Sequence, residues 1–268
     1  MTFDIILTNP CGRTGEIVAQ SLRAHGLKVY IMEGPSARKD PPGYFRELRK
    51  VLDQTGAKTV IPVFFPEVLS AARDEFPGIR VLAAPASAIR LLDDKLAACS
   101  LAERLGIPQP QRYSSPEEVP DSAFPVVFKR PDGQGGDSVY FPRNRRALDN
   151  LCRTAQRYLI TDFIEGRNVC VDAIRVGDCF DARCYRVLLP EGKGVSQLRE
   201  AVEMPQLVQW TRAILEAADY EGVCGADFRV DAQGNASFLE CNPRFSGGLQ
   251  TTIDSGLDLP WLLYEKSL

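Results

Sequence analysis

Histidine is nearly absent from this sequence, because His25 is the only one among 268 residues. Nucleophilic catalysis by Ser-His-Asp or Cys-His groups needs a histidine that is oriented by a partner. His25 lies between "SLRA" and Gly26, where a predicted helix ends, and such a position is typical of a solvated residue in the last helical turn. The sequence therefore argues against catalysis through a triad.

CxxC pairs are also absent, although the chain contains eight cysteines. Without such pairs, and with one histidine, the sequence lacks the ligand spacing of a zinc site. Most of the cysteines lie among apolar residues, and no basic segment precedes the short apolar run at the N-terminus, as a signal peptide would require. We therefore expect buried free thiols and a cytoplasmic location.

Neither a basic excess nor a long apolar run is present. The 32 lysines and arginines are balanced by 35 aspartates and glutamates, which gives a net charge of −3 and no reason to expect nucleic-acid binding. No apolar stretch approaches the ~18 residues of a membrane-spanning helix. The composition, 44% hydrophobic and 25% charged, is typical of a globular protein with one large or two smaller domains.

The first third of the chain contains an alternation of strands and helices. "FDIILT", "KVYIME", "KTVIPV" and "IRVLA" read as strands. Helices are predicted in "EIVAQSLRAHG" and at residues 44–54, 66–75 and 85–92. Alternation of this kind indicates a parallel sheet covered by helices on both faces. Residues 1–92 are therefore predicted to form a small Rossmann-like domain.

A glycine turn, from Gly12 to Gly15, follows the first predicted strand. Such a turn could hold a phosphate at the N-terminus of the next helix. The full GxGxxG motif is absent, and Glu33, at the end of the second strand, is only suggestive of a ribose ligand. The pattern favours a tight strand-to-helix turn that binds no nucleotide.

From Asp93 onward the pattern changes. "DDKLAACSLAERLGIPQPQRY" predicts a helix that ends at Gly106, before two prolines. The next stretch reads as strand, loop, strand, helix and strand, and it predicts a lid at about residues 112–160. A long hairpin that turns at Gly177 and Asp178 follows, then a helix in "PQLVQWTRAILEAADY", a hairpin at residues 225–241 and a C-terminal helix.

The last hairpin is the most informative segment. If Gln233 and Gly234 are the two central residues of its turn, Arg229 faces Phe238 and Asp227 faces Glu240. Residues that are directly opposed lie on one face of the sheet, with Cβ atoms ~5 Å apart. Asn242 joins that face two residues later. Two carboxylates and an amide oxygen are hard ligands of the kind that Mg²⁺ prefers. The alternative is a solvated sheet face on which Arg229 neutralises the two acids.

Lys129 and Lys95 could each have either a binding role or a purely structural one. Lys129 lies in the apolar strand "FPVVFKR", directly before the glycine-rich "PDGQGGDS", and could place a charge on a polyphosphate. It could equally be a solvated lysine at a hairpin loop. Lys95 opens a helix, where the helix dipole disfavours a cation. Pairing with Asp93 or Asp94 would give it a purely structural role.

The order of these segments resembles the ATP-grasp superfamily, and in particular its carbamoyl-phosphate-synthase-like and carboxylate–amine ligase members. The resemblance runs through "DDK", "LGIPQP", "VVFKRPDGQGGDSV", "LITDFIEGRN", "GADFRVDAQGNASFLECNPRFSGG" and "TIDSGLDLP". It implies an α/β and α+β chain, with a Rossmann-like domain at residues 1–92 and an ATP-grasp domain with a mobile lid at residues 93–268.

The resemblance also implies roles for individual residues. Lys95 and Lys129 would contact ATP phosphates, and Arg244 would face the acyl phosphate or the substrate carboxylate. Mg²⁺ or Mn²⁺ would be held by Asp227, Glu240 and Asn242. The lid loop over the phosphates would contain Gly133, Gly135 and Gly136. The hinge against adenine would comprise Thr161, Asp162, Phe163 and Ile164. Asn168 stands where many relatives have a glutamate that contacts the ribose, and this departure puts that contact in doubt.

The function implied by the resemblance is ATP-dependent ligation. A small-molecule carboxylate would be activated as an acyl phosphate and joined to an amine, with Mg·ATP consumed. "RVLLPEGKGVSQ" is predicted to form a loop over the substrate, with Arg186 and Lys193 as candidate contacts. Carboxyphosphate or carbamate chemistry is one alternative, and an ATP-binding sensor without turnover is another. The sequence leaves open whether the chain forms a homodimer or binds a partner subunit.

Overall fold

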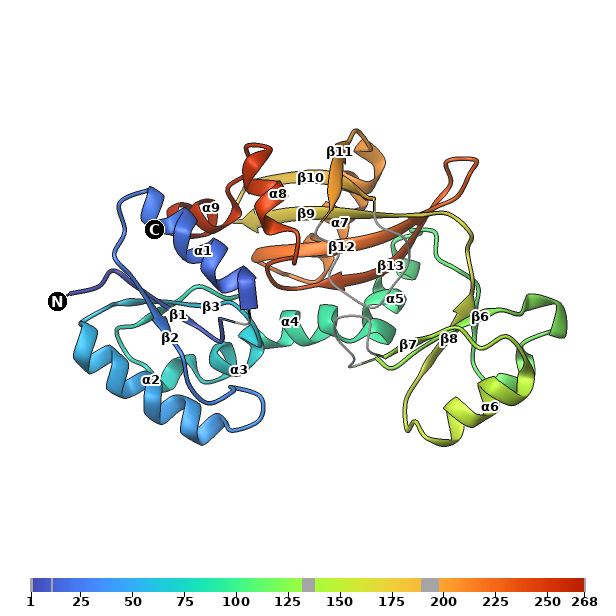
Figure 1. The fold of residues 1–268 in the computed structure, drawn as a ribbon, viewed down its shortest axis with the longest axis horizontal. Helices are drawn as coiled ribbons and strands as arrows, with labels where there is room; N and C mark the ends of the chain where they lie inside the picture. The colour runs from blue at the N-terminus through green and yellow to red at the C-terminus, as the bar shows by residue number, and fades with distance from the viewer. Residues whose placement is uncertain (1, 11, 132–137, 189–197, 268) are drawn as a thin grey trace.

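The computed structural model describes residues 2–10, 12–131, 138–188 and 198–267. Three β-sheets succeed one another along the molecule (Figure 1). The expected lid-loop glycines Gly133, Gly135 and Gly136 lie outside the described residues, as does Lys193. No helix among the described residues is long and apolar enough to cross a membrane.

The N-terminal sheet is parallel, as its strand–helix alternation predicts. Its strand order is β2-β1-β3-β4, with β1 Ile5–Thr8, β2 Val29–Met32, β3 Thr59–Pro62 and β4 Arg80–Val81. The helices of this region are α1 Gly12–Ala24, α2 Pro41–Thr55, α3 Pro66–Ala71 and α4 Ala86–Asp93, with a 3₁₀ turn at Arg73–Glu75.

The glycine segment after β1 forms the first turn of α1 rather than a separate loop. A Cβ atom on Gly15 would lie 2.5 Å from the Cβ of Pro10, far inside van der Waals contact. Gly15 is therefore required by the close approach of α1 to the end of β1. This packing supplies a structural reason for the glycine, in line with the tight turn that the sequence favours.

The second sheet along the sequence is antiparallel, lies at the right end of the molecule in Figure 1 and corresponds to the predicted lid. Its order is β5-β8-β6-β7, with β5 Arg112–Tyr113, β8 Leu159–Asp162, β6 Val126–Lys129 and β7 Val139–Tyr140. Helix α6 Arg145–Arg153 packs on it through Leu148, which is fully buried with Phe128 and Ile160. Helix α5 Lys95–Arg104 precedes this sheet and contacts the third one.

The third sheet is the largest and is antiparallel. Its order is β11-β10-β9-β12-β13, with β9 Arg167–Val176, β10 Cys179–Val187, β11 Arg199–Val202, β12 Gly222–Val230 and β13 Ala236–Asn242. Helix α7 Pro205–Ala217 packs on β9 and β10. The hairpin at Gly177 is confirmed, whereas β11 was not predicted. Arg186 lies in strand β10, so the prediction of a loop was wrong for this residue.

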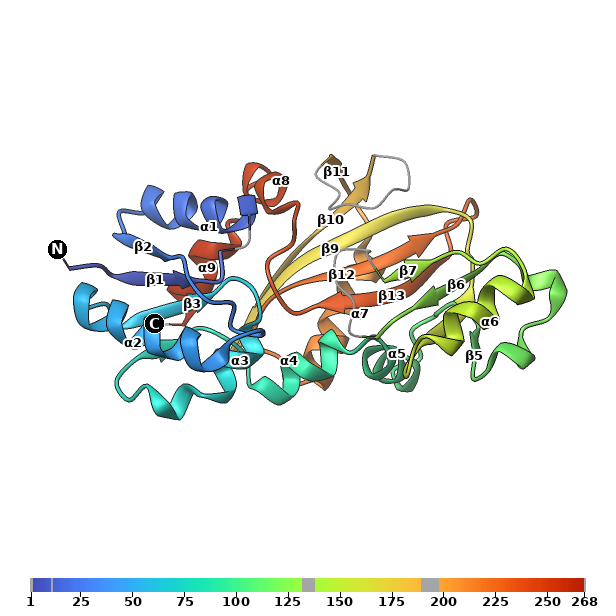
Figure 2. The same cartoon turned by 60° about the horizontal axis from the view of Figure 1, so that its bottom comes forward.

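The C-terminal helices return to the N-terminal sheet. Helices α8 Leu249–Asp254 and α9 Leu259–Lys266 lie beside α1 (Figure 2). Leu249, Leu259 and Leu263 share one buried core with β1 and α1. His25 stacks on Trp261, with ring centroids 4.1 Å apart, and is 3.1 Å from Asp258. His25 is exposed, as the sequence predicts, but its stacking on Trp261 and its contact with Asp258 were not predicted. The division at residue 92 stays a prediction.

Candidate functional site

The β12–β13 hairpin brings the two predicted carboxylates together. Asp227 pairs with Glu240, as predicted. Arg229, however, faces Ser237 rather than Phe238, because the register changes by one residue between Asp227 and Phe228. This bulge at Leu239 has a consequence for packing. Phe238 pairs with Phe228 in the buried core, while Glu240, only two residues later, still joins Asp227.

Asn242 completes a polar cluster with these two acids. Its Nδ2 donates to Asp227 Oδ2 at 3.2 Å and to Glu240 Oε1 at 3.4 Å. The amide nitrogen and oxygen of asparagine are assigned from hydrogen bonds, and the reverse orientation would turn Asn242 Oδ1 toward the acids as a third oxygen. The cluster therefore presents oxygen ligands from two adjacent strands, as a small divalent cation requires.

The two carboxyl groups ionise differently. Burial, together with the charge of Glu240, raises the pKa of Asp227 to about 7. Burial also acts to raise the pKa of Glu240, but Lys129 and Lys95 outweigh it and hold that pKa below its usual range. A carboxyl group whose ionisation is opposed by burial and by a neighbouring carboxylate gains from a bound metal ion. The residues therefore fit the divalent cation that the sequence predicts.

Cation binding by this cluster is expected to depend on pH. Asp227 must lose its proton to act as a ligand, so the affinity for Mn²⁺ should fall about tenfold per pH unit below pH 7 and level off above about pH 8. Calorimetric titration of Mn²⁺ from pH 5.5 to 8.5 measures this. Asp227→Asn should remove the dependence, and equal wild-type affinities at pH 6 and pH 8 would contradict the assignment.

Both predicted lysines lie near the acids. The Nζ of Lys95 is 3.5 Å from Glu240 Oε2, and its side chain is 8% exposed. Asp94 caps the N-terminus of α5 by accepting from the backbone N–H groups of Leu96 and Ala97. Lys129 is buried at the end of β6 and lowers the pKa of Glu240 by its charge. Lys95 thus contacts an acid that lies far along the chain, on strand β13.

Arg244 follows the cluster and connects it to the N-terminal sheet. Its Nη2 donates to Asn242 Oδ1 at 3.2 Å, and its Nη1 donates to the carbonyl of Phe245. The guanidinium lies 5.2 Å from the ring centroid of Phe64, which is two residues beyond the end of β3. The Nε of Arg244 is buried without a hydrogen-bond partner among the described residues. Phe64 was missed, because no local pattern relates it to Arg244.

The predicted hinge joins the β5-β8-β6-β7 sheet to the third sheet. Thr161 and Asp162 end strand β8, and Asp162 accepts from the hydroxyl of Tyr113 at 2.6 Å, which raises the pKa of Tyr113 to about 12. The guanidinium carbon of Arg229 lies over the ring of Phe163, 5.6 Å from the centroid of that ring.

Two further predicted residues have contacts of other kinds. Asn168 pairs with Arg229 across β9 and β12, and its Oδ1 is buried without a partner in the described part of the chain. An orphaned acceptor at this position suits a ligand that donates a hydrogen bond. Arg186 forms an ion pair with Glu200 on β11.

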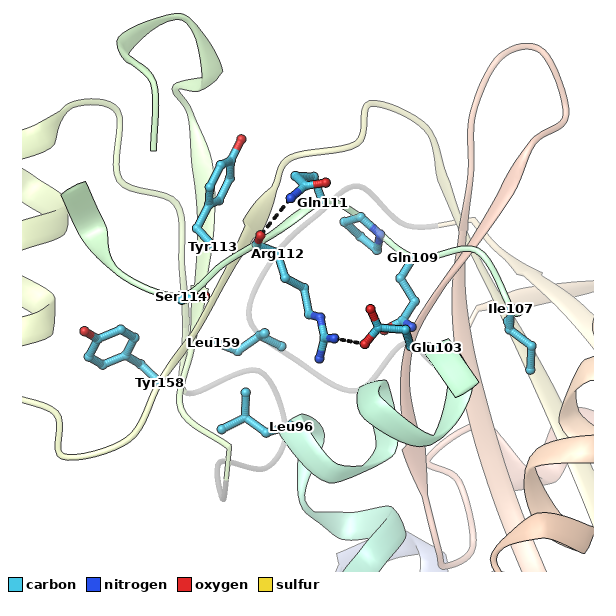
Figure 3. A pocket seen from close by; sticks show the side chains of 11 residues that line it. Leu96, Glu103, Ile107, Gln109, Gln111, Arg112, Tyr113, Ser114, Tyr158 and Leu159 are labelled. Carbon is cyan, nitrogen blue, oxygen red and sulfur yellow. Dashed lines mark hydrogen bonds and ion pairs between the residues drawn. The ribbon is translucent and has the colours of Figure 1, made fainter. Parts of the chain in front are cut away.

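A separate cavity of about 620 Å³ lies between α5 and strands β5 and β8 (Figure 3). Arg112 projects into it from β5 and forms an ion pair with Glu103 of α5. The other lining groups include Leu96, Gln109 and Leu159. Among the described residues, none that lines this cavity is a predicted metal, phosphate or hinge residue. The cavity therefore borders the candidate site on the side of α5 but does not coincide with it.

The sequence is similar to those of several known proteins. Residues 154–268 match a family model described as "ATP-grasp in the biosynthetic pathway with Ter operon". The carbamoyl phosphate synthase large chain of Thermus thermophilus is 32% identical over 196 residues, which are 64% of this chain and 19% of that protein. A 5-formaminoimidazole-4-carboxamide-1-(beta)-D-ribofuranosyl 5'-monophosphate synthetase of Pyrobaculum aerophilum is 31% identical over 46% of this chain and 36% of its own length. The chain thus spans about a fifth to a third of these relatives.

Solved structures share the fold along almost the whole chain. A biotin carboxylase from Campylobacter jejuni superposes with a TM-score of 0.82 at 14% identity, covering 99% of this chain and 71% of that one. An L-amino acid ligase from Bacillus licheniformis gives a TM-score of 0.76 at 14% identity, covering 98% and 73%. At such low identity the likeness shows the fold alone, and it confirms the fold class that the sequence predicts.

Proposed function

Because the chain belongs to the ATP-grasp superfamily, we propose that it is an ATP-dependent ligase for small molecules. It would activate a carboxylate as an acyl phosphate and join it to an amine or a similar nucleophile, releasing ADP and phosphate. The observation that carries this proposal is the cluster of Asp227, Glu240 and Asn242, with Lys95 at 3.5 Å and Arg244 at 3.2 Å from its members.

The groups of the cluster suit phosphoryl transfer. This reaction needs positioning and charge neutralisation more than covalent chemistry from the protein. Asp227, Glu240 and Asn242 would hold Mg²⁺ or Mn²⁺, which when bound offsets the negative charge of the phosphates. Lys95 and Lys129 place two buried or nearly buried ammonium groups beside the acids, and they would bind phosphate oxygens.

Arg244 would contribute directional recognition. Its planar guanidinium can hold a carboxylate or a phosphate through two parallel hydrogen bonds. Its Nε, which has no partner among the described residues, leaves one donor to be satisfied by a ligand. The position of Arg244 between Asn242 and Phe64 puts it where the third sheet meets the N-terminal sheet. We infer that the acyl group reacts at this junction.

The identity of the carboxylate distinguishes two versions of the proposal. Bicarbonate would give carboxyphosphate, and the similarity to carbamoyl phosphate synthase and biotin carboxylase favours testing it. An amino acid or another organic acid would give an acyl phosphate, and the similarity to an L-amino acid ligase favours testing that. Both versions use the same residues, so the chemistry at the metal and phosphate is common to them.

ADP release with Mg·ATP tests the proposal. We expect at least one combination from a panel of amino acids, small carboxylates, amines and bicarbonate to raise ADP release at least about tenfold over ATP alone, which corresponds to about 1.4 kcal/mol in the barrier. Omission of bicarbonate separates the two versions. ATP binding without stimulated ADP release by any combination would favour a sensor without turnover, and AMP as the product would contradict acyl-phosphate chemistry.

A further inference from the structure

A buried ion pair lies in the third sheet, outside the residues that the proposed function uses. Asp172 on β9 is fully buried, and its Oδ2 accepts from Arg199 Nη2 of β11 at 2.8 Å. The same oxygen accepts from Ser246 Oγ at 3.0 Å and from Thr252 Oγ1. One carboxylate oxygen thus collects three donors from three different segments of the chain.

The guanidinium of Arg199 is closely packed. Its Cζ lies 4.7 Å from the ring centroid of Tyr185, whose hydroxyl is 2.6 Å from Ser255 Oγ. Gly248 also lies against it, because a Cβ added there would be only 2.0 Å from Arg199 Cζ. The charge of Asp172 helps to keep the pKa of Arg199 above its usual value, against the effect of burial, which would lower it.

These contacts fix the short segment that carries Arg244. Ser246 and Gly248 follow Arg244 within four residues, and both touch the ion pair, as does Thr252 of α8. The segment therefore leaves the metal cluster at Asn242 and is anchored to β9 and β11 directly after Arg244. A buried ion pair often adds little net stability compared with apolar residues. We therefore explain this pair by the segment that it holds in place rather than by its contribution to stability.

We infer that Asp172 and Arg199 are positioning residues, which hold residues 243–248 so that Arg244 is set against the phosphate bound at the Asp227–Glu240–Asn242 cluster. They touch neither metal nor phosphate themselves. The inference rests on the proposed function, because it assigns the ion pair to the placement of Arg244. It adds Asp172 and Arg199, which the sequence did not indicate, to the residues on which that function depends.

A double-mutant cycle on phosphate affinity tests the inference. The probe is inorganic phosphate, titrated by calorimetry into the protein loaded with Mg·ADP. Arg199→Lys keeps the charge but loses the flat group beside Tyr185 and Gly248, so phosphate affinity should fall at least about tenfold while ADP affinity stays within about twofold. In an Arg244→Lys background, Arg199→Lys should have almost no further effect, because it acts through Arg244.

Two glycine variants provide a matched comparison. Gly248→Ala should displace Arg199 and weaken phosphate binding in the same way. Gly34→Ala, whose added Cβ would meet Glu47 Cγ at an ordinary 3.6 Å, should leave it unchanged. If Arg199→Lys does not fold, Thr252→Val removes one donor to Asp172 and keeps the ion pair, and it replaces Arg199→Lys in the cycle.

The outcomes separate this inference from the proposed function. Independent, multiplicative losses from Arg199→Lys and Arg244→Lys would overturn the positioning role while leaving the phosphate site intact. Equal losses of ADP and phosphate affinity would reduce the ion pair to general stabilisation and also overturn it. If Arg244→Lys alone does not change phosphate affinity, the proposed role of Arg244 fails, and the positioning role falls with it.

Discussion

Asp227→Asn and Glu240→Gln are each expected to lower turnover at least ~100-fold, which corresponds to about 2.7 kcal/mol in the barrier. The two acids are paired across β12 and β13, and Asn242 donates to both. Either substitution leaves one carboxylate and removes half of the negative charge that would hold the divalent cation. Charge stabilisation at a transferring phosphoryl group is the largest contribution that this site can make.

Steady-state ADP release at saturating Mg·ATP measures this effect. Glu216→Gln is a matched control, since Glu216 is a surface carboxylate on α7 that pairs with Arg212 in the preceding turn. The control should keep turnover within about twofold. Full activity of Asp227→Asn and Glu240→Gln, even after treatment with EDTA, would remove the metal site from the account.

Arg244→Lys is expected to abolish most ligase turnover while it preserves the fold and most of the ATP affinity. Arg244 contacts Asn242 and Phe64, and one of its nitrogens is buried and unpaired among the described residues. A lysine supplies a point charge but cannot form two parallel hydrogen bonds to a carboxylate or phosphate. We expect a loss of at least about 100-fold in turnover, with ATP affinity changed by less than about threefold.

The alternative for Arg244 is a counter-ion that only neutralises nearby acids. A lysine would then suffice, and turnover would stay within a few-fold of the unsubstituted protein. Steady-state kinetics, together with calorimetry of the non-hydrolysable ATP analogue, distinguishes the two. Arg212→Lys on the surface of α7 serves as the matched control for an arginine in a simple ion pair, and near-normal turnover of Arg244→Lys would leave Arg244 structural.

The predictable part of the site is the part encoded locally. Counting outward from Gln233 and Gly234 paired Asp227 with Glu240 correctly. Next to the turn the count was wrong by one residue, since Ala236 pairs with Val230 rather than Asp231 and Arg229 pairs with Ser237. The bulge at Leu239 adds one residue to β13 and so restores the predicted pairing of Asp227 with Glu240. In a strand with a strict period of two, Phe238 and Glu240 would lie on the same face. The bulge instead lets Phe238 reach the core while Glu240 reaches the cluster.

The unpredicted part depends on contacts between distant segments. Phe64 meets Arg244, and Asp172 meets Arg199, Ser246 and Thr252, only because three sheets and the C-terminal helices pack together. Strand β11 and helix α8 are short, and their residues lack a clear period of two or 3.6. The stacking of His25 on Trp261 was likewise not predicted, since nothing near His25 in the sequence indicates that ring.

The central claim is that a carboxylate is activated by phosphoryl transfer at the Asp227–Glu240–Asn242 cluster. Transfer of ¹⁸O tests it most directly. The carboxylate that stimulates ADP release is labelled with ¹⁸O, and the inorganic phosphate formed in a complete reaction is examined by ³¹P NMR. The account predicts one ¹⁸O atom in each phosphate, because the carboxylate oxygen that attacks ATP leaves with the phosphoryl group. Unlabelled phosphate, formed at the same rate as ADP, would contradict it.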